Sequence, residues 1–212
     1  MSKRRNAKNS NKPVSLLILE GYTENIYYPI LRDNFLKNIR IELRNIKGQG
    51  NINKDILSEI YKYVYNNPKD LVRTYCCVDS EKQKRTATPL DLNLVREYIR
   101  NRKLNHVLSV DSILADPDIE SWFFCDVEGI YKFLGAKKSR RNIKKYQDHS
   151  KFGKKELKKL FHMFGKEYIP GRRAEFFISQ LDVVKIVSKC KELSDGIALC
   201  KSNANDSTNH LF

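Results

Sequence analysis

Two short apolar segments that each stop at acidic residues constrain the fold of this chain more than any other feature. The first, Val14 to Leu19, ends at Glu20-Gly21, and the second, Thr74 to Val78, ends at Asp79-Ser80-Glu81. Continuous apolar runs of this length are typical of strands that are covered on both faces, as in a parallel sheet. Because open parallel sheets carry their chemistry at the carboxyl ends of the strands, we expect these acids to share one crevice.

Strand and helix patterns alternate along residues 13–130. Apolar residues at spacings of three and four predict helices after Glu20, over residues 52–65 and after Pro89. Segments 39–46 and 106–110 predict two further strands, and Thr23 is expected to cap the first helix. This order implies an α/β domain, with a mostly parallel sheet flanked by helices.

The character of the chain changes at about residue 130. Residues 132–173 contain 15 Lys and Arg against three Asp and Glu, so they carry 15 − 3 = +12 of the net charge of +15. Interleaved apolar residues at helical spacing predict a basic helical C-terminal region over 131–200, packed on the α/β domain. Its last helix is expected after Gly171, with buried positions at Phe176, Phe177, Leu181, Val184 and Val187. Residues 1–12 are predicted to form a flexible basic arm, and residues 201–212 a polar, frayed tail.

The charge balance predicts a polyanionic partner. A net charge of +15 and a pI near 9.6 favour nucleic acid, although a solvated basic surface is the simpler alternative. Candidate nucleic-acid-binding residues lie beside the second acidic group and in the basic region: Lys82, Lys84, Arg85, Lys137, Lys138, Arg140, Arg141, Lys144, Lys145, Arg172 and Arg173.

Cysteine usage and hydropathy bear on the cellular setting. The five cysteines form no C-x-x-C pair and the four histidines no H-E-x-x-H motif, so the sequence predicts no zinc finger. Buried, reduced thiols in a cytoplasmic protein are expected instead. No apolar stretch has the length of a membrane span and no signal-peptide core follows the basic N-terminus, so we expect no membrane partner.

The two acidic groups predict a divalent metal site. Mg²⁺, or Mn²⁺ in its place, prefers hard oxygen ligands, and clustered carboxylates repel one another unless a cation neutralises them. Asp79 and Glu81 could hold one ion, while Glu20 and Glu24 could hold a second or act as a general acid or base. Glu20 and Asp79 could instead cap helices, and Glu24 could be an acid favoured by the helix dipole.

A third acidic group follows the predicted strand at 106–110. Glu120 is a further candidate metal ligand, whereas Asp118 could cap a helix over Ile119–Phe124. Asp111 is interpreted as a surface acid at a strand end. The neighbouring Trp122 and Phe123 are expected in the core rather than as a platform for bases.

Three segments together resemble a known family. Ile18 to Glu24 followed by Tyr27-Tyr28 resembles the E-G-x-T-E-x-x-Y-[FY] opening of RloB-like proteins, which are related to Toprim domains. Val78 to Glu81 is similar to the Toprim D-x-D, and Pro117 to Phe123 looks like the N-P-x-F-E-x-W-[LF] segment. The match spans roughly residues 14–125. It departs from the family pattern at Glu81, which replaces an aspartate, and at Asp116, which replaces an asparagine.

This resemblance implies a Toprim-like fold and Mg²⁺-dependent phosphodiester chemistry, as in topoisomerases, primases and OLD-type nucleases. It also implies a role in bacterial defence against phage, in some relatives through cleavage of RNA, including tRNA. On this analogy Glu20 is a general acid/base or a ligand, and Glu24, Asp79 and Glu81 are ligands. An ATPase or sensor protein as partner rests on the family analogy alone, and self-association is left open.

The leading interpretation is a metal-dependent nuclease that acts on RNA or DNA as an effector of anti-phage defence, with Glu20 and Asp79 as its catalytic residues. The alternative is a non-catalytic nucleic-acid-binding protein on a degenerate Toprim scaffold. A third reading, a phosphotransfer domain with Asp79 as acceptor, lacks the paired acids on the first strand and leaves the basic region without a role.

Overall fold

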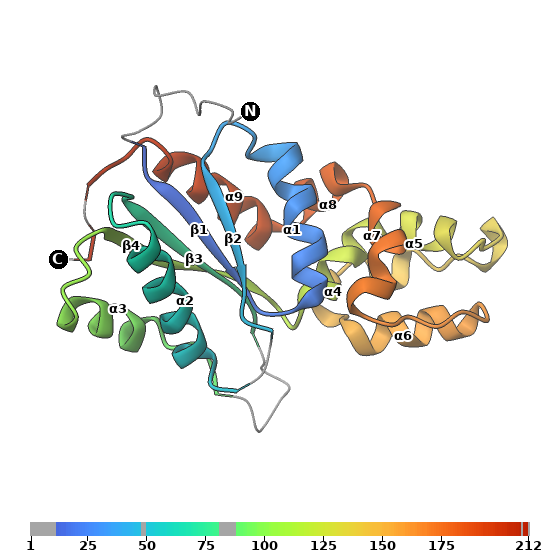
Figure 1. Ribbon diagram of the computed structural model, residues 1–212. Coiled ribbons are helices and arrows are strands. Elements are labelled where there is room, and N and C mark those ends of the chain that lie inside the picture. Colours follow the sequence, from blue (N-terminus) through green and yellow to red (C-terminus); the bar gives the residue numbers. More distant parts are fainter. Residues whose placement is uncertain (1–11, 48–49, 81–87, 209, 212) are drawn as a thin grey trace, which may run out of the picture.

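A four-stranded parallel sheet forms the centre of the computed structural model, which describes residues 12–47, 50–80, 88–208 and 210–211. The strands lie in the order β2-β1-β3-β4, and every neighbouring pair is parallel. Their bounds are β1 (Val14–Leu19), β2 (Ile41–Asn45), β3 (Val72–Asp79) and β4 (Val107–Ala115). The predicted α/β class, with helices flanking a parallel sheet, is confirmed (Figure 1).

The continuous apolar run of β1 supplies both faces of the sheet. Leu16 and Ile18 pack on the side of α2 (Ile52–Asn66) and α3 (Leu92–Asn101). Leu17 and Leu19 face the other way, into a larger core with α1 (Tyr22–Phe35). Because side chains alternate along a strand, an apolar residue at each position means that both faces are covered.

The larger core continues into the C-terminal half without a break. It joins Leu17 of β1 to Trp122 and Phe123, which are buried as predicted, and to Leu193 near the end of the chain. Figure 1 shows α5, α6 and α7 on one side of the molecule, away from α2 and α3. The helices of this half are α4 (Ile119–Phe123), α5 (Val127–Phe133), α6 (Lys154–Met163), α7 (Glu175–Ser179), α8 (Val183–Lys189) and α9 (Lys191–Asn203), with 3-10 helices η2 (Phe124–Asp126), η3 (Lys138–Arg140), η4 (Lys144–Tyr146), η5 (His149–Lys151) and η6 (Gly171–Ala174).

The single last helix predicted after Gly171 is wrong, because this stretch contains α7, α8 and α9. Asp182 separates α7 from α8 and accepts a hydrogen bond from the amide of Lys185, as an N-cap does. This break changes the helical phase, so Phe176 and Val184 are exposed where burial was predicted.

The predicted frayed tail is also wrong for the residues that the structure describes. The guanidinium of Arg73, which is 1% exposed, donates to the carbonyls of Asp206 and Thr208 and pairs with the Asp206 carboxylate at 2.8 Å. The amide of His210 donates to the carbonyl of Leu108, and Leu211 is buried in the core beneath α2 and α3. The chain end therefore stabilises the sheet.

Two local predictions near the sheet need correction. The N-cap of α1 is Gly21 rather than Thr23, which lies inside the helix. Asp111 lies within β4, since this strand continues to Ala115, and it accepts a hydrogen bond from Ser109 and pairs with Arg96. Apolar residues beyond Val110 extend the strand past the point at which the sequence pattern placed its end.

All five cysteines are free and buried, as predicted. In the described part of the chain, no helix combines the length and apolar character needed to cross a membrane.

The strand order places a topological switch point between β1 and β3. After β1 the chain moves outward to β2, then returns past β1 to form β3 and β4 on the other side. At such a point the connections leave the carboxyl ends of adjacent strands in opposite directions and open a crevice. Glu20 and Asp79 stand at the carboxyl ends of these two strands.

Candidate metal centre

Glu20 and Asp79 are in direct contact across the switch point. Leu19 pairs with Cys77 in the parallel ladder, so Glu20 leaves the sheet beside the last residues of β3. The Oε2 atom of Glu20 accepts a hydrogen bond from the amide of Asp79 at 3.0 Å. The sheet register therefore fixes the first two predicted residues side by side.

The carboxylate of Asp79 reaches the next element of the site. Its Oδ1 atom accepts a hydrogen bond from the amide of Ile119 at 2.9 Å, at the first turn of α4. Asp79 thus caps a helix, as the alternative interpretation proposed, but the helix is α4, 40 residues further on. This contact holds Glu120, the second residue of α4, close to the ends of β1 and β3.

Glu24 lies in the first turn of α1 and its side chain is buried. Burial raises its pKa from 4.5 to about 7, and the negative charges of Glu120 and Glu20 add to this shift. A Cβ atom at Gly21 would lie 3.1 Å from the Oε2 atom of Glu24. The glycine of the Glu20-Gly21 pair therefore leaves room for this carboxylate beside the backbone.

Glu120 is fully buried. Its Oε1 atom accepts a hydrogen bond from the hydroxyl of Tyr168 at 2.9 Å, whereas Oε2 accepts none from the part of the chain that the structure describes. The Nζ atom of Lys154 lies 3.9 Å from Oε2. Burial, with the nearby charge of Asp118, raises the pKa of Glu120 to about 7 although Lys154 and Tyr168 oppose the shift.

Asp118 connects this site to α6. It occupies the N-cap position of α4 but makes no capping hydrogen bond there. Both its carboxylate oxygens instead accept from the amide of Lys154, at 3.1 and 3.0 Å, at the start of α6. A Cβ atom at Gly153 would lie 2.7 Å from this carboxylate, so the glycine permits the contact. Asp118 thus stands at the predicted N-cap position of α4, but its carboxylate also binds the start of a helix 36 residues away.

Among the described residues, Lys154 is the lysine that lies close to this concentration of negative charge. Burial and the charges of Glu24, Glu20 and Glu120 raise the pKa of Asp79 well above its ordinary value. Burial by itself would lower the pKa of Lys154, but the surrounding carboxylates together raise it. We refer to Glu20, Glu24, Asp79 and Glu120 as the carboxylate cluster.

The carboxylate cluster fits the donor requirements of a hard divalent cation. All potential ligand atoms of the cluster are carboxylate oxygens. One of these oxygens, Oε2 of Glu120, accepts no hydrogen bond within the described ranges. A cation would also relieve the mutual repulsion of the carboxylates. Among the described residues, no three of these carboxylates bring oxygen atoms within 4.8 Å of one another. Side chains of the cluster would therefore have to turn toward a bound ion.

Several predicted site residues fall outside the described residues. These are Glu81, Lys82, Lys84 and Arg85, within the segment 81–87. Their roles stay predictions.

The remaining predicted basic residues lie on the surface of the C-terminal half. Arg141 is half-buried and donates to the carbonyl of Ala136, and the others are exposed. Arg172 and Arg173 belong to η6, which packs against α1, and the amide of Gly171 approaches the hydroxyl of Thr23. The others lie in and around η3 and η4: Lys137, Lys138, Arg140, Lys144 and Lys145.

A pocket of about 970 Å³ opens in the C-terminal half. Its walls come from α6 and the turn after it, and include Lys158, Lys159, His162, Lys166 and Tyr168. The hydroxyl of Tyr168 also donates to Glu120, so Tyr168 is shared by this pocket and the cluster.

Sequence reasoning did not single out Lys154 or Tyr168. Lys154 is one of 15 bases in residues 132–173, and nothing in its local pattern distinguishes it from Lys155. The sequence signal that could have pointed to Lys154 is the preceding residue, Gly153. A glycine at the start of a helix indicates that another group approaches the backbone closely there. Tyr168 lies outside regular structure, where no periodicity predicts a direction for its side chain.

Comparison with known proteins adds little. No protein-family model matches the chain, and no curated protein matches it. Among solved structures, it is similar to the C-terminal region of the OLD protein of Xanthomonas campestris pv. campestris, with 16% sequence identity and a TM-score of 0.37, covering 89% of this chain and 97% of that one. A TM-score of 0.37 is too low to assign the chain to a family or to transfer any property to it.

Proposed function

We propose that the protein is a metal-dependent nuclease that cleaves phosphodiester bonds in RNA or DNA. The observation that carries the proposal is the convergence of Glu20, Glu24, Asp79 and Glu120 at the carboxyl ends of β1 and β3, beside a strongly basic surface. Carboxylates at a switch point offer metal ligands, and a basic surface attracts the phosphate backbone.

The carboxylate cluster would hold Mg²⁺ or Mn²⁺, with Glu81 as a further predicted ligand. When bound, the ion supplies charge neutralisation at a phosphodiester group and a more acidic water. Glu20 and Asp79 are the proposed catalytic residues, because they stand nearest the crevice between the diverging connections. Lys154 balances the charge of the buried carboxylates, and Tyr168 holds one oxygen of Glu120 in place.

The basic residues would position the substrate. Lys158, Lys159 and Lys166 line the pocket that shares Tyr168 with the cluster, and they would bind phosphates of the substrate there. Arg172 and Arg173, on η6, flank the first turn of α1 that carries Glu24. Substrate contacts are thus expected on both sides of the carboxylates.

The finer parts of the proposal follow from the resemblance to RloB-like proteins. They are a substrate class that includes tRNA, a role as an effector of bacterial anti-phage defence in the cytoplasm, and restraint or activation by an ATPase or sensor protein.

The test is a cleavage assay with variants that preserve the observed hydrogen bonds. Purified protein is incubated with total tRNA, single-stranded DNA and plasmid, with Mg²⁺, Mn²⁺ or EDTA. Glu20→Gln keeps an acceptor for the amide of Asp79, and Asp79→Asn keeps one for the amide of Ile119. Glu59→Gln, on the outer face of α2, is the matched control.

The proposal predicts that one of the three nucleic-acid pools is cleaved. The cleavage should require metal, its rate should fall at least 100-fold in both site variants, and the rate should be unchanged in Glu59→Gln. A loss of 100-fold corresponds to about 2.7 kcal/mol of transition-state stabilisation. Cleavage that persists in both site variants would contradict the assigned centre.

The alternative is a non-catalytic nucleic-acid-binding protein, and one observation favours it. Asp79 and Asp118 serve as helix caps and Lys154 already offsets part of the negative charge, as expected of acids that only stabilise the fold. This alternative predicts salt-dependent binding to nucleic acid without turnover, and equal binding by Glu20→Gln and the unmodified protein.

A further inference from the structure

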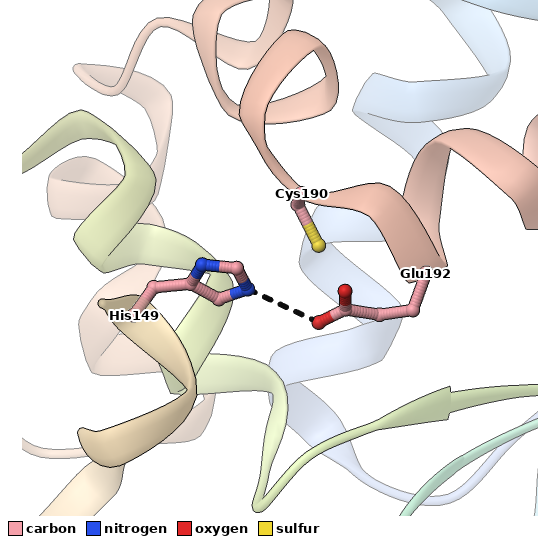
Figure 2. Close-up of side chains that lie close together, drawn as sticks. All are labelled: His149, Cys190 and Glu192. Atoms are coloured by element: carbon pink, nitrogen blue, oxygen red, sulfur yellow. Dashed lines mark hydrogen bonds and ion pairs between the residues drawn. The ribbon is translucent and has the colours of Figure 1, made fainter. Parts of the chain in front are cut away.

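A second group of chemically reactive side chains lies apart from the carboxylate cluster. Ligand atoms of His149, Cys190 and Glu192 all lie within 4.8 Å of one another (Figure 2). The Nε2 atom of His149 is 3.2 Å from the Oε1 atom of Glu192. Cys190 is fully buried between α8 and α9, and its side chain points toward the other two in Figure 2.

A second cysteine adjoins this group. Cys125, in η2, interacts with both Cys190 and His149, but its Sγ atom is not part of the group whose ligand atoms all lie within 4.8 Å. These contacts lower the pKa of Cys125 to about 6 and raise that of His149 to about 9. Two thiols, an imidazole and a carboxylate are thereby gathered from three separate parts of the chain.

The grouping differs from the rest of the molecule. Cys76 and Cys77 in β3 lie in the apolar cores on the two faces of the sheet, as buried cysteines commonly do. Cys200 lies in the larger core, which also contains Cys125 and Cys190, but Cys190 differs in having ligand atoms of His149 and Glu192 close by. Among the described residues, His149, Cys190 and Glu192 are the one set of three His, Cys, Asp or Glu residues with ligand atoms this close.

We propose that Cys125, His149, Cys190 and Glu192 form a binding site for one structural Zn²⁺ ion. Zinc in structural sites takes four ligands from sulfur, nitrogen and carboxylate oxygen in a tetrahedron. Ligand atoms in such a tetrahedron are roughly 3.3–3.9 Å apart, so a contraction of at most about 1.5 Å would bring the three closest atoms to this geometry. The two thiol ligands favour zinc over Mg²⁺ or Mn²⁺, which prefer oxygen.

The surroundings orient one ligand and leave a route for the ion. The indole Nε1 of Trp122 donates to the Oε1 atom of Glu192 at 3.1 Å, a contact of the kind that holds metal ligands in place. The side chains of His149 and Glu192 are 19% and 32% exposed, so an ion can enter from solvent. With four protein ligands, the coordination sphere is complete, as in zinc sites that stabilise a fold.

The proposed ion would tie together segments that have little regular structure of their own. His149 belongs to η5, the last of three short 3-10 helices between α5 and α6, whereas Cys190 and Glu192 belong to the α8–α9 junction. Cys125 follows α4 directly, and α4 carries Glu120. Zinc would therefore hold the basic segment between α5 and α6 close to α4, the helix that carries Glu120. This inference does not depend on whether the protein is a nuclease.

The test measures zinc content and stability of the full chain. Protein dialysed against EDTA is titrated with Zn²⁺, freed of unbound metal and analysed for zinc, and thermal unfolding is followed before and after loading. We expect one zinc per chain and a rise in the unfolding midpoint of about 5–10 °C when zinc is about 100-fold above its Kd. Cobalt in place of zinc should give the absorption bands of a tetrahedral site with sulfur ligands.

Matched variants separate the site from other metal binding. Cys190→Ser and His149→Gln should lose the bound zinc and the stabilisation, whereas Cys200→Ser and His162→Gln should keep both. His149→Gln changes a partly exposed side chain, so it reports on the site even if Cys190→Ser fails to fold. Glu20→Gln and Asp79→Asn should keep the zinc.

Equal zinc content in the unmodified protein and the His149→Gln variant would overturn the proposal. A Cys125–Cys190 disulfide found by mass spectrometry in freshly purified, unreduced protein would also overturn the proposal. The two cysteines would then form a disulfide bond instead of binding zinc as thiolates.

Discussion

The Oε2 atom of Glu20 accepts a hydrogen bond from the backbone amide of Asp79 at a distance of 3.0 Å. The contact joins the carboxyl ends of β1 and β3, the adjacent strands at which the strand order reverses. Asp79 in turn binds the amide of Ile119, and thus places Glu120 against the same crevice. Two hydrogen bonds therefore connect three stretches of sequence into one acidic site.

Comparing two substitutions at Glu20 isolates its hydrogen bond from its charge. Glu20→Gln keeps an acceptor for the amide of Asp79 and removes repulsion with Glu24, so metal-free protein should be at least as stable as the unmodified chain at neutral pH. Glu20→Ala loses the acceptor and should be less stable than Glu20→Gln by about 1–2 kcal/mol in urea unfolding. Equal stability of the two variants would show that the contact contributes nothing.

Lys154 is expected to substitute partly for a metal ion. Lys154→Met removes the positive charge 3.9 Å from Glu120, and because Lys154 is partly exposed the free energy of unfolding should fall by only about 1–2 kcal/mol in EDTA. Mg²⁺ should then raise the unfolding midpoint more in this variant than in the unmodified protein. Lys155→Met, at the exposed neighbouring position, should match the unmodified protein. An equal response to Mg²⁺ in all three proteins would contradict this role.

The raised pKa of Glu120 predicts a pH dependence of stability in metal-free protein. A carboxyl group whose pKa rises from 4.5 to about 7 on folding favours the fold when protonated. Its contribution is fully present below pH 4.5 and is lost as the pH rises through about 7. It amounts to about 3 kcal/mol at most, since part of the shift depends on the charges of neighbouring carboxylates.

Glu120→Gln isolates this effect. Its unfolding free energy in EDTA, measured relative to the unmodified protein, should increase by up to about 3 kcal/mol between pH values of about 4.5 and 8. Glu59→Gln, on the surface of α2, should show no such trend. A difference for Glu120→Gln that does not change with pH would contradict the assigned environment.

Most of the fold could be predicted from the sequence, because the apolar runs and helical spacings report burial locally. Contacts between distant residues could not. Asp79 and Asp118 look like caps for the helices that follow them, yet they cap helices 40 and 36 residues away. Cys125 and Cys190 are 65 residues apart and match no zinc motif, so their proximity depends on how η2 packs against α8. The end of the chain reads as polar, because the buried Leu211 follows a run of mostly hydrophilic residues.

The packing of the chain end gives a stability prediction. Arg73→Ala should lower the free energy of unfolding by about 3 kcal/mol or more, because it leaves the carbonyls of Asp206 and Thr208 without their donor. Asp206→Asn keeps both carbonyls and should cost about 1 kcal/mol. Urea unfolding measures both. A smaller loss in Arg73→Ala than in Asp206→Asn would mean that the chain end does not pack as described.

The most direct test of the central claim is a Mn²⁺ titration followed by electron paramagnetic resonance, since free and bound Mn²⁺ give different signals. The account predicts saturable binding to the unmodified protein and to Glu59→Gln, and loss of at least 10-fold in affinity, or about 1.4 kcal/mol, when Glu20→Gln and Asp79→Asn are combined. The same affinity in the double variant would contradict the assignment of the carboxylate cluster as the metal centre.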